Sequence, residues 1–229
     1  MVRTFTRHWK WGAAALALTA AIPAALVLLP GAPAPAADHL DPPTRTDAEM
    51  GATSPDVPAD IADVFAWHTD TSIIVGLTFA GPKEANAPGV YDRDVLYTIN
   101  ISTAAPAATP EFQIRVRFGE DTTKAGTQNG VQFSGIPGVT GNIEGPVETT
   151  FTRDGVTARA GLFQDPFFFD LLGFRETRSM QTLRFNNQRD FFLNKNDTGF
   201  IIEIPRSRLS TGSNPIDVWA TAARFGSRL

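Results

Sequence analysis

Alternating apolar residues mark the central part of the chain as β structure. From residue 73 to 79 the apolar set Ile73, Val75, Leu77 and Phe79 alternates with Ile74, Gly76 and Thr78. A two-residue period places successive side chains on opposite faces of a strand. The run 64–67 before it is β-branched and aromatic, and Thr69–Ser72 between the runs has the composition of a turn. We therefore predict an antiparallel hairpin over 60–80, whose apolar side is covered by a second layer.

The same alternation and further apolar runs predict more strands later in the chain. The dipeptide Asp154-Gly155 is favoured at a two-residue hairpin turn. Residues 119–146 contain seven glycines and two prolines, which predicts a long excursion with at most a short strand near 131–133. About eight short strands predict an all-β fold, an antiparallel β-sandwich with one short helix and long loops. The other predicted strands cover 95–101, 111–118, 147–153, 156–161, 200–204 and 218–223.

The single helix is predicted at Gln164–Arg175. Asp165 is a suitable N-cap and Pro166 suits the first helical position. Successive helical residues point about 100° apart, so three consecutive phenylalanines cannot all face one sheet. Most are core anchors, and one is expected to cover a loop or line a pocket. The arginines that follow are candidates for binding an anionic or saccharide ligand. The alternative is that they pair with surface carboxylates. The candidate ligand-binding residues are Phe167, Phe168, Phe169 and Arg175.

The first 37 residues predict an export signal. Basic residues precede the uncharged run Trp11–Leu29, and small residues in an A-x-A arrangement follow at Gly31–Ala37. The run is long for a signal peptide, so an uncleaved membrane anchor is the alternative. Pro23 and Pro30 interrupt the run, which favours cleavage. We predict a signal at 1–37, a polar arm at 38–59 and one β-sandwich domain at 60–229, secreted or periplasmic in location.

Charge and cysteine content exclude several classes of function. The leader carries three basic residues and no acidic one, so its removal takes the net charge from −4 to about −7. An acidic domain is unsuited to nucleic acid and to anionic lipid, which leaves 11–29, if uncleaved, as the predicted membrane contact. The chain has no cysteine, which excludes disulfides, thiol catalysis, thiolate metal sites and lipoprotein acylation.

Two metal sites are hypotheses from the sequence. Cleavage after Ala36 would leave a mature start of Ala37-Asp38-His39, whose amine, peptide nitrogens and imidazole suit square-planar copper or nickel. The alternative is that His39 anchors the arm through a local hydrogen bond. The second hypothesis is a calcium site with Asp41, Asp60 and Asp63 as oxygen ligands. Against it, Asp60 and Asp63 are also suited to bonding backbone amides near a turn.

Catalytic motifs are scarce. Outside the leader only His39 and His68 can serve as the base of a Ser-His-Asp arrangement, and the G-x-S-x-G, P-loop and H-E-x-x-H motifs are absent. His68 is placed at a strand end, where a solvent-facing imidazole is the ordinary reading. A pair among the 24 acidic residues remains the route to a hydrolase.

Four short motifs in order resemble one family. They are Asp38–Pro43 (DHLDPP), Asp60–Ala66 (DIADVFA), Asp165–Asp170 (DPFFFD) and Val218–Thr221 (VWAT). Their order resembles exported bacterial proteins grouped as domain of unknown function 4331, over essentially the whole mature chain. The resemblance implies an exported β-rich domain without an established activity. Family members often carry an acidic, calcium-like turn after the L-Y-x-I strand, whereas residues 102–110 here contain no carboxylate.

The hairpin and the next two strands are also similar to DOMON and family-nine carbohydrate-binding sandwiches, which bind haem or sugar. The combined interpretation is an exported, non-catalytic, DOMON-like or jelly-roll sandwich that binds a carbohydrate, a metal ion or an envelope protein. The alternatives are a carboxylate-dependent hydrolase and a structural or matrix protein of the envelope.

Overall fold

A computed structural model provides the structure of this chain. It describes residues 42–44, 54–104, 109–121, 123, 128–209 and 215–225. The predicted export signal, the predicted copper or nickel site at 37–39 and the candidate ligands His39 and Asp41 lie outside the described residues. Part of the predicted arm is described, and it contains a β-bridge between Thr44 and Pro55 and a 3₁₀ turn at Val57–Ala59.

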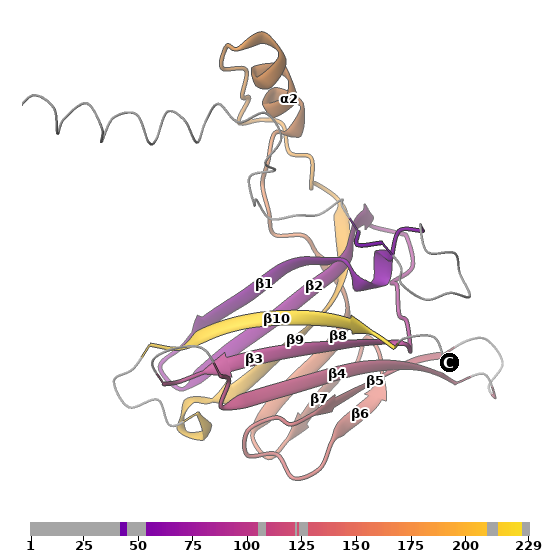
Figure 1. Cartoon of the computed structure of the whole chain (residues 1–229), viewed down its shortest axis with the longest axis vertical. Helices are drawn as coiled ribbons and strands as arrows, with labels where there is room; N and C mark the ends of the chain where they lie inside the picture. Colours follow the sequence, from indigo (N-terminus) through magenta and orange to yellow (C-terminus); the bar gives the residue numbers. More distant parts are fainter. Residues whose placement is uncertain are drawn as a thin grey trace, which may run out of the picture. The chain divides into compact units, whose positions relative to one another are not determined.

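Two five-stranded antiparallel sheets pack face to face, which confirms the predicted β-sandwich (Figure 1). The first sheet has the strand order β1-β2-β9-β8-β7, with the bounds Ile61–His68, Ser72–Glu84, Lys195–Pro205, Val156–Gln164 and Thr150–Arg153. The second sheet has the order β10-β3-β4-β5-β6, with the bounds Asp217–Arg224, Val95–Ser102, Phe112–Asp121, Gln128–Ser134 and Ile143–Pro146.

The predicted central hairpin is present as β1 and β2. The two strands pair antiparallel with Ala66 opposite Val75, and the Thr69 hydroxyl accepts the Ser72 amide at 3.0 Å in the turn. The predicted apolar set on β2 is buried, as alternation requires. Ile74 and Thr78 on the other face are also buried. Strand β2 is therefore covered on both faces, where the sequence predicted one, whereas most of β1 is half-buried or exposed.

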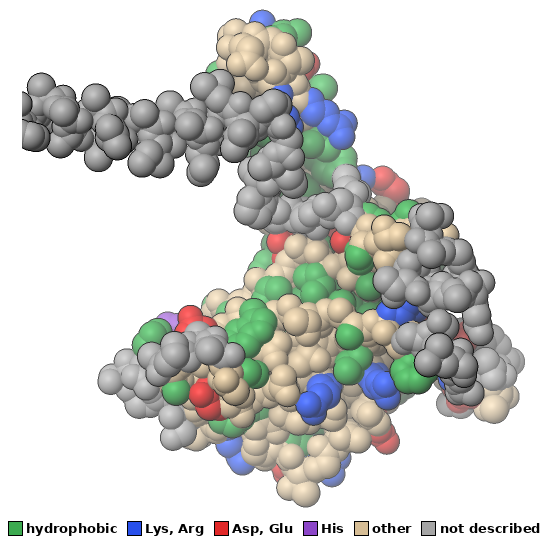
Figure 2. Space-filling model, in the orientation of Figure 1, with side chains coloured by type: hydrophobic (Ala, Val, Ile, Leu, Met, Phe, Trp, Pro, Cys, Tyr) green, Lys and Arg blue, Asp and Glu red, His purple; other side chains and the backbone are tan. Residues whose placement is uncertain are grey.

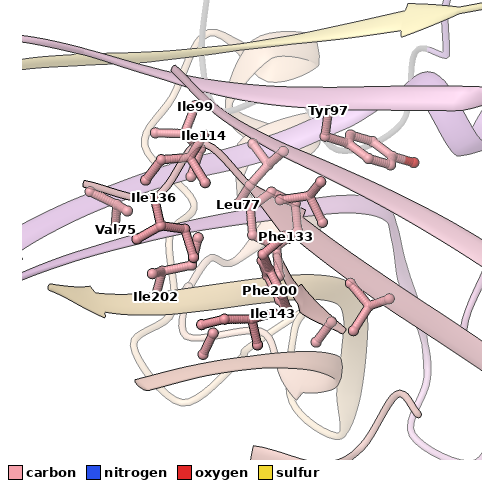
Figure 3. Packing of buried hydrophobic residues seen from close by; sticks show 14 of the residues in the cluster. Val75, Leu77, Tyr97, Ile99, Ile114, Phe133, Ile136, Ile143, Phe200 and Ile202 are labelled. Carbon is pink, nitrogen blue, oxygen red and sulfur yellow. The ribbon is translucent and has the colours of Figure 1, made fainter. Parts of the chain in front are cut away.

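The core lies between the sheets and is mainly aliphatic and aromatic (Figure 3). Leu77 and Phe200 from the first sheet meet Ile114 and Phe133 from the second. Phe133 and Phe200 are in edge contact at 6.1 Å between ring centroids. Apolar area removed from water contributes about 25 cal/mol per Å², so this shared layer is what holds the two sheets together.

Some element boundaries differ from the predictions. The described part of the chain has ten strands where about eight were predicted, and the additional β6 pairs with β5 inside the glycine-rich 119–146 segment. The predicted turn at Asp154-Gly155 is confirmed, and both residues have positive φ, 50° and 80°. That combination matches the favoured twist of a two-residue hairpin.

The predicted start of the helix is wrong. Helix α2 spans Leu171–Met180 with Asp170 as its N-cap, rather than starting after Asp165. The Asp165 amide donates to the Lys195 carbonyl at 3.1 Å and so continues the β8–β9 pairing. The Asp165 carboxylate accepts the Phe167 amide, which holds 165–167 in a non-helical turn. Strand pairing at Asp165 therefore moves the start of the helix to Leu171. Among the described residues, no helix has the length and apolarity needed to span a bilayer.

Candidate functional site

The chain leaves the sandwich between β8 and β9 to form an insertion, Asp165–Asn194, that contains α2 (Figure 1). Large apolar side chains are unusually exposed on this β8–β9 insertion. Of the twelve exposed large apolar residues in the described part of the chain, eight belong to it. They are Phe167, Phe168, Leu172, Phe174, Met180, Leu183, Phe185 and Leu193. Because a folded domain normally keeps such side chains scattered, this clustering makes the insertion the candidate binding surface.

The insertion has a small aromatic cluster of its own. Phe169 lies at its centre, 5.7 Å from Phe167, 5.5 Å from Phe174 and 6.2 Å from Phe185 between ring centroids. Phe192 closes one side against Phe167 at 5.1 Å and is buried. Aromatic contacts of this kind contribute about 0.5–1.5 kcal/mol beyond buried area. The cluster orders the insertion while its outer rings stay exposed.

Asp170 joins the helix start to the returning loop. One carboxylate oxygen accepts the Gly173 amide at 2.9 Å, and the other accepts the Asn186 amide at 2.7 Å and the Arg189 guanidinium at 2.9 Å. Burial of this carboxyl opposes its ionisation, but these hydrogen bonds outweigh burial and hold the pKa of Asp170 below its usual value. A Cβ at Gly173 would lie 2.8 Å from the Arg184 carbonyl oxygen, so glycine allows the loop to approach the helix.

The exposed polar surface of the insertion is basic. Arg175, Arg178 and Arg184 are exposed, and Arg178 lies 5.8 Å from the ring of Phe174. Two of its carboxylates are engaged within the insertion, since Asp170 is buried and Asp190 accepts the amides of nearby phenylalanines, whereas Glu176 is 37% exposed beside Arg189. Figure 2 shows blue basic side chains beside green apolar ones on this part of the surface. An apolar and basic surface is therefore carried by a chain whose net charge is −4.

The structure brings the four predicted ligand-binding residues into this one insertion. Phe167 and Phe168 are exposed, Phe169 is half-buried in the aromatic cluster, and Arg175 is exposed on α2. The sequence predicted that one of the three phenylalanines leaves the core. In the structure all three lie outside the core between the sheets, because the whole insertion does. The exposed Leu172, Met180 and Leu183 were missed. Their spacing in the sequence did not indicate exposure, because exposure depends on what packs against α2 and the loop that follows it.

The predicted calcium ligands lie near the start of β1. Asp60 is buried and its carbonyl accepts the Ala80 amide, while Asp63 is half-buried on β1 and its amide donates to the Thr78 hydroxyl. Within the described part of the chain, no three His, Cys, Asp or Glu side chains lie close enough together to hold a metal ion. His68 is exposed beside the hairpin turn. Sequence reasoning missed Asp197, which is fully buried on β9.

Two open hollows on the sandwich offer less than the insertion. A groove of about 740 Å³ runs along β4, β5 and β6, where Gln132 and Glu144 are joined by a 2.9 Å hydrogen bond. A second hollow of about 330 Å³ lies beside Trp67, His68 and Arg206. Saccharide sites usually need a flat aromatic surface as well as polar groups, and Trp67 is the exposed ring in the second hollow.

No family model, curated protein or solved structure matches this chain. The resemblance to the domain of unknown function 4331 family therefore stays a prediction from four motifs. One of those motifs, Asp165–Asp170, forms the beginning of the β8–β9 insertion.

Proposed function

We propose that this chain is an exported, non-catalytic β-sandwich that docks onto another protein of the cell envelope through its β8–β9 insertion. The proposal is carried by one observation, the concentration of exposed large apolar side chains on the insertion. Exposed apolar area of this density is stabilised when a partner covers it. Of the three ligand classes predicted from the sequence, an envelope protein suits this surface best.

The composition of the insertion favours a protein partner over a lipid surface. Residues 165–194 contain seven phenylalanines, one methionine and four arginines, and no lysine, tryptophan or tyrosine. Phenylalanine, methionine and arginine are enriched at protein interfaces, from which lysine is depleted. The aromatic belts at membrane interfaces are instead rich in tryptophan and tyrosine, which the insertion lacks. The partner is therefore expected to offer an apolar groove with an acidic rim, complementary to Arg175, Arg178 and Arg184.

The acidic residues of the sandwich do not favour the hydrolase alternative. Asp165 and Asp197, two carboxyls that interact with each other, are the candidate catalytic pair, and they are only 5% and 0% exposed. A general acid and its partner must reach the bond that they cleave. In this conformation a substrate does not reach Asp197.

A triple variant tests the docking surface. Phe168, Leu172 and Leu183 are exposed and take no part in the ring contacts of the aromatic cluster, so F168S/L172S/L183S is expected to fold normally. A photo-crosslinking amino acid at Leu183, the most exposed of the set, identifies the protein that contacts the insertion in intact cells. Calorimetry with that purified partner is expected to show at least about a tenfold loss of affinity in the triple variant.

The matched control is V64S/F225S, which removes exposed apolar side chains outside the insertion. It is expected to bind like the wild type. Equal affinity of the triple variant, or equal losses in both variants, would contradict the proposal. Sedimentation of the wild type with liposomes, or as a self-associated species that the triple variant abolishes, would replace the protein partner by a membrane or a second copy and would also overturn it.

A further inference from the structure

A second group of side chains lies where the insertion joins the sandwich. Asp197 on β9 and Asp165 at the end of β8 occupy the face of the first sheet turned away from the core, as the register Phe163–Asp197 and Thr198–Phe79 requires. Asp63 on β1 lies on the same face, opposite Thr78. Three acidic residues, on or beside β1, β8 and β9, thus share one face at one end of the sheet.

Asp197 is a buried acid whose negative charge is not stabilised by hydrogen-bond donors. It is 0% exposed, and neither carboxylate oxygen accepts a hydrogen bond from an amide, a hydroxyl or a basic side chain. Burial, followed by the carboxyls of Asp165 and Asp63, raises the pKa of Asp197 well above its usual range. A buried carboxylate in this setting must be neutralised by a proton or paired with a cation.

The neighbouring basic side chains are already engaged elsewhere. Lys195, two residues before Asp197, binds Glu84 at 2.7 Å between Nζ and Oε1. Arg189 in the insertion binds Asp170 at 2.9 Å. Neither of these two basic side chains is therefore the ion-pair partner of Asp197.

The backbone beside Asp197 is shaped around its carboxylate. The β2–β9 pairing passes from Phe79–Thr198 to Lys83–Asn196, so residues 80–82 of β2 form an irregularity opposite Asp197. A Cβ at Gly81 would lie 1.6 Å from Oδ1 of Asp197. Only glycine lets the main chain approach this closely, and the main-chain oxygens of such an irregular segment are not committed to the ladder.

We propose that Asp165 and Asp197 hold a calcium ion at the base of the β8–β9 insertion. Calcium takes six to eight oxygen ligands and accepts carboxylates, main-chain carbonyls and water together. Because no three acidic or histidine side chains meet in the described region, two carboxylates supply the charge, and main-chain oxygens and water complete the shell. Asp63 adds a nearby negative charge that favours a cation.

The ion would fasten the insertion to the sandwich. Asp165 is the first residue of the insertion, and its carboxylate also accepts the Phe167 amide at 2.9 Å. A cation shared with Asp197 links this turn to β9 and so fixes where the aromatic cluster begins. This inference is independent of the docking proposal, because it concerns the base of the insertion and not its exposed surface.

The test uses the purified mature protein after treatment with a chelator. Native mass spectrometry is expected to show one calcium ion per chain after calcium is returned. The melting temperature is expected to rise by about 5–10 °C at a hundredfold excess over Kd. D197N is expected to lose this rise while its metal-free form melts no lower than the metal-free wild type, because the buried charge is gone. D165N provides a second variant for the same readout.

The matched control is Glu203→Gln, because Glu203 is an exposed acid on the same face of β9. It is expected to keep the full response to calcium. Failure of the wild type to bind calcium, with no change in melting temperature, overturns the proposal and leaves Asp165 and Asp197 as a pair that shares a proton. A response retained in D197N and D165N, or stronger binding of magnesium or manganese, also overturns it. None of these results alters the partner-binding test.

Discussion

Arg224, at the end of β10, binds two aspartates that are distant in the sequence. Its guanidinium donates to both oxygens of Asp56 at 2.5 Å and to Asp92 at 2.8 Å. The Arg224 and Asp56 side chains are only 7% and 5% exposed. Arg93, by contrast, is 80% exposed and lies 3.7 Å from Asp94. These two arginines represent a buried and a surface ion pair in one protein.

We predict that Arg224→Met destabilises the protein by about 3–5 kcal/mol, because it leaves the buried carboxylate of Asp56 without its partner. Arg93→Met, the surface control, is expected to change the free energy of unfolding by no more than about 0.5 kcal/mol. Urea unfolding of both variants measures the difference. Equal values for the two arginines would show that burial does not set the strength of the Arg224 pair.

At the scale of elements, Asp170 holds α2 to the loop that returns to β9. Its pKa lies below the usual value because amides and Arg189 stabilise the charged form. A carboxyl with a depressed folded pKa contributes stability above its unfolded pKa of about 4, and this contribution is lost as the pH falls through the folded value. The insertion is therefore expected to respond to acid before the sandwich does.

We predict that the amides of Gly173 and Asn186 lose hydrogen-exchange protection as the pH falls below about 4, while amides in β2 and β9 keep theirs. At neutral pH, Asp170→Asn is expected to lower protection at Gly173 and Asn186 by about tenfold or more. Glu176→Gln is the control, since Glu176 lies 3.8 Å from Arg189 and bonds neither amide. If the insertion and both strands lost protection at the same pH, the prediction that the insertion opens before the sandwich would be wrong.

At the scale of the whole molecule, Tyr97 connects the second sheet to the segment before β1, and Tyr91 packs against Phe118 of the same sheet. Tyr97 is fully buried, stacks on Phe79 at 4.2 Å and donates its hydroxyl to the Pro58 carbonyl. Burial raises its pKa above the ordinary value. Burial, followed by the charge of Glu148, raises the pKa of Tyr91 to about 12. The folded protein therefore favours the protonated form of both phenols.

We predict a loss of stability in alkaline solution. A group whose folded pKa is raised contributes stability that is intact below its unfolded pKa of about 10 and is lost as the pH rises through the folded value. For Tyr91 this window runs from about 10 to 12, and about 1–2 kcal/mol is expected to be lost across it. Tyr91→Phe is expected to show a shallower fall in urea-unfolding free energy over this range. If the unfolding free energy of Tyr91→Phe fell as steeply with pH as that of the wild type, Tyr91 would not be the source of the alkaline loss of stability.

Local patterns predicted the sandwich well. The alternation at 73–79 identified a buried strand because adjacent side chains along a strand point to opposite faces. Asp154-Gly155 identified a hairpin because few residues accept two successive positive φ angles. The helix start failed for a non-local reason, since the Asp165 amide is used by pairing with Lys195 across the insertion.

The candidate sites depended more strongly on tertiary structure. The sequence pointed to Phe167, Phe168, Phe169 and Arg175, but it did not distinguish rings that pack between sheets from rings that stay exposed. That distinction depends on where the β8–β9 insertion leaves the fold. Nothing in the segment around Asp197 marks it as special, because its importance comes from burial and from Asp165 and Asp63 on other strands.

By itself, the sequence determined the strand periodicity, the hairpin turns, the absence of disulfides and the apolar content of the insertion, because each follows from neighbouring residues or from composition. Only the tertiary structure decided which charges are buried together and which apolar rings are left exposed. Arg224 meets Asp56, and Asp197 meets Asp165, only after the sheets have formed. Solvation and charge pairing depend on every segment that surrounds a side chain, and those segments are brought together by the fold.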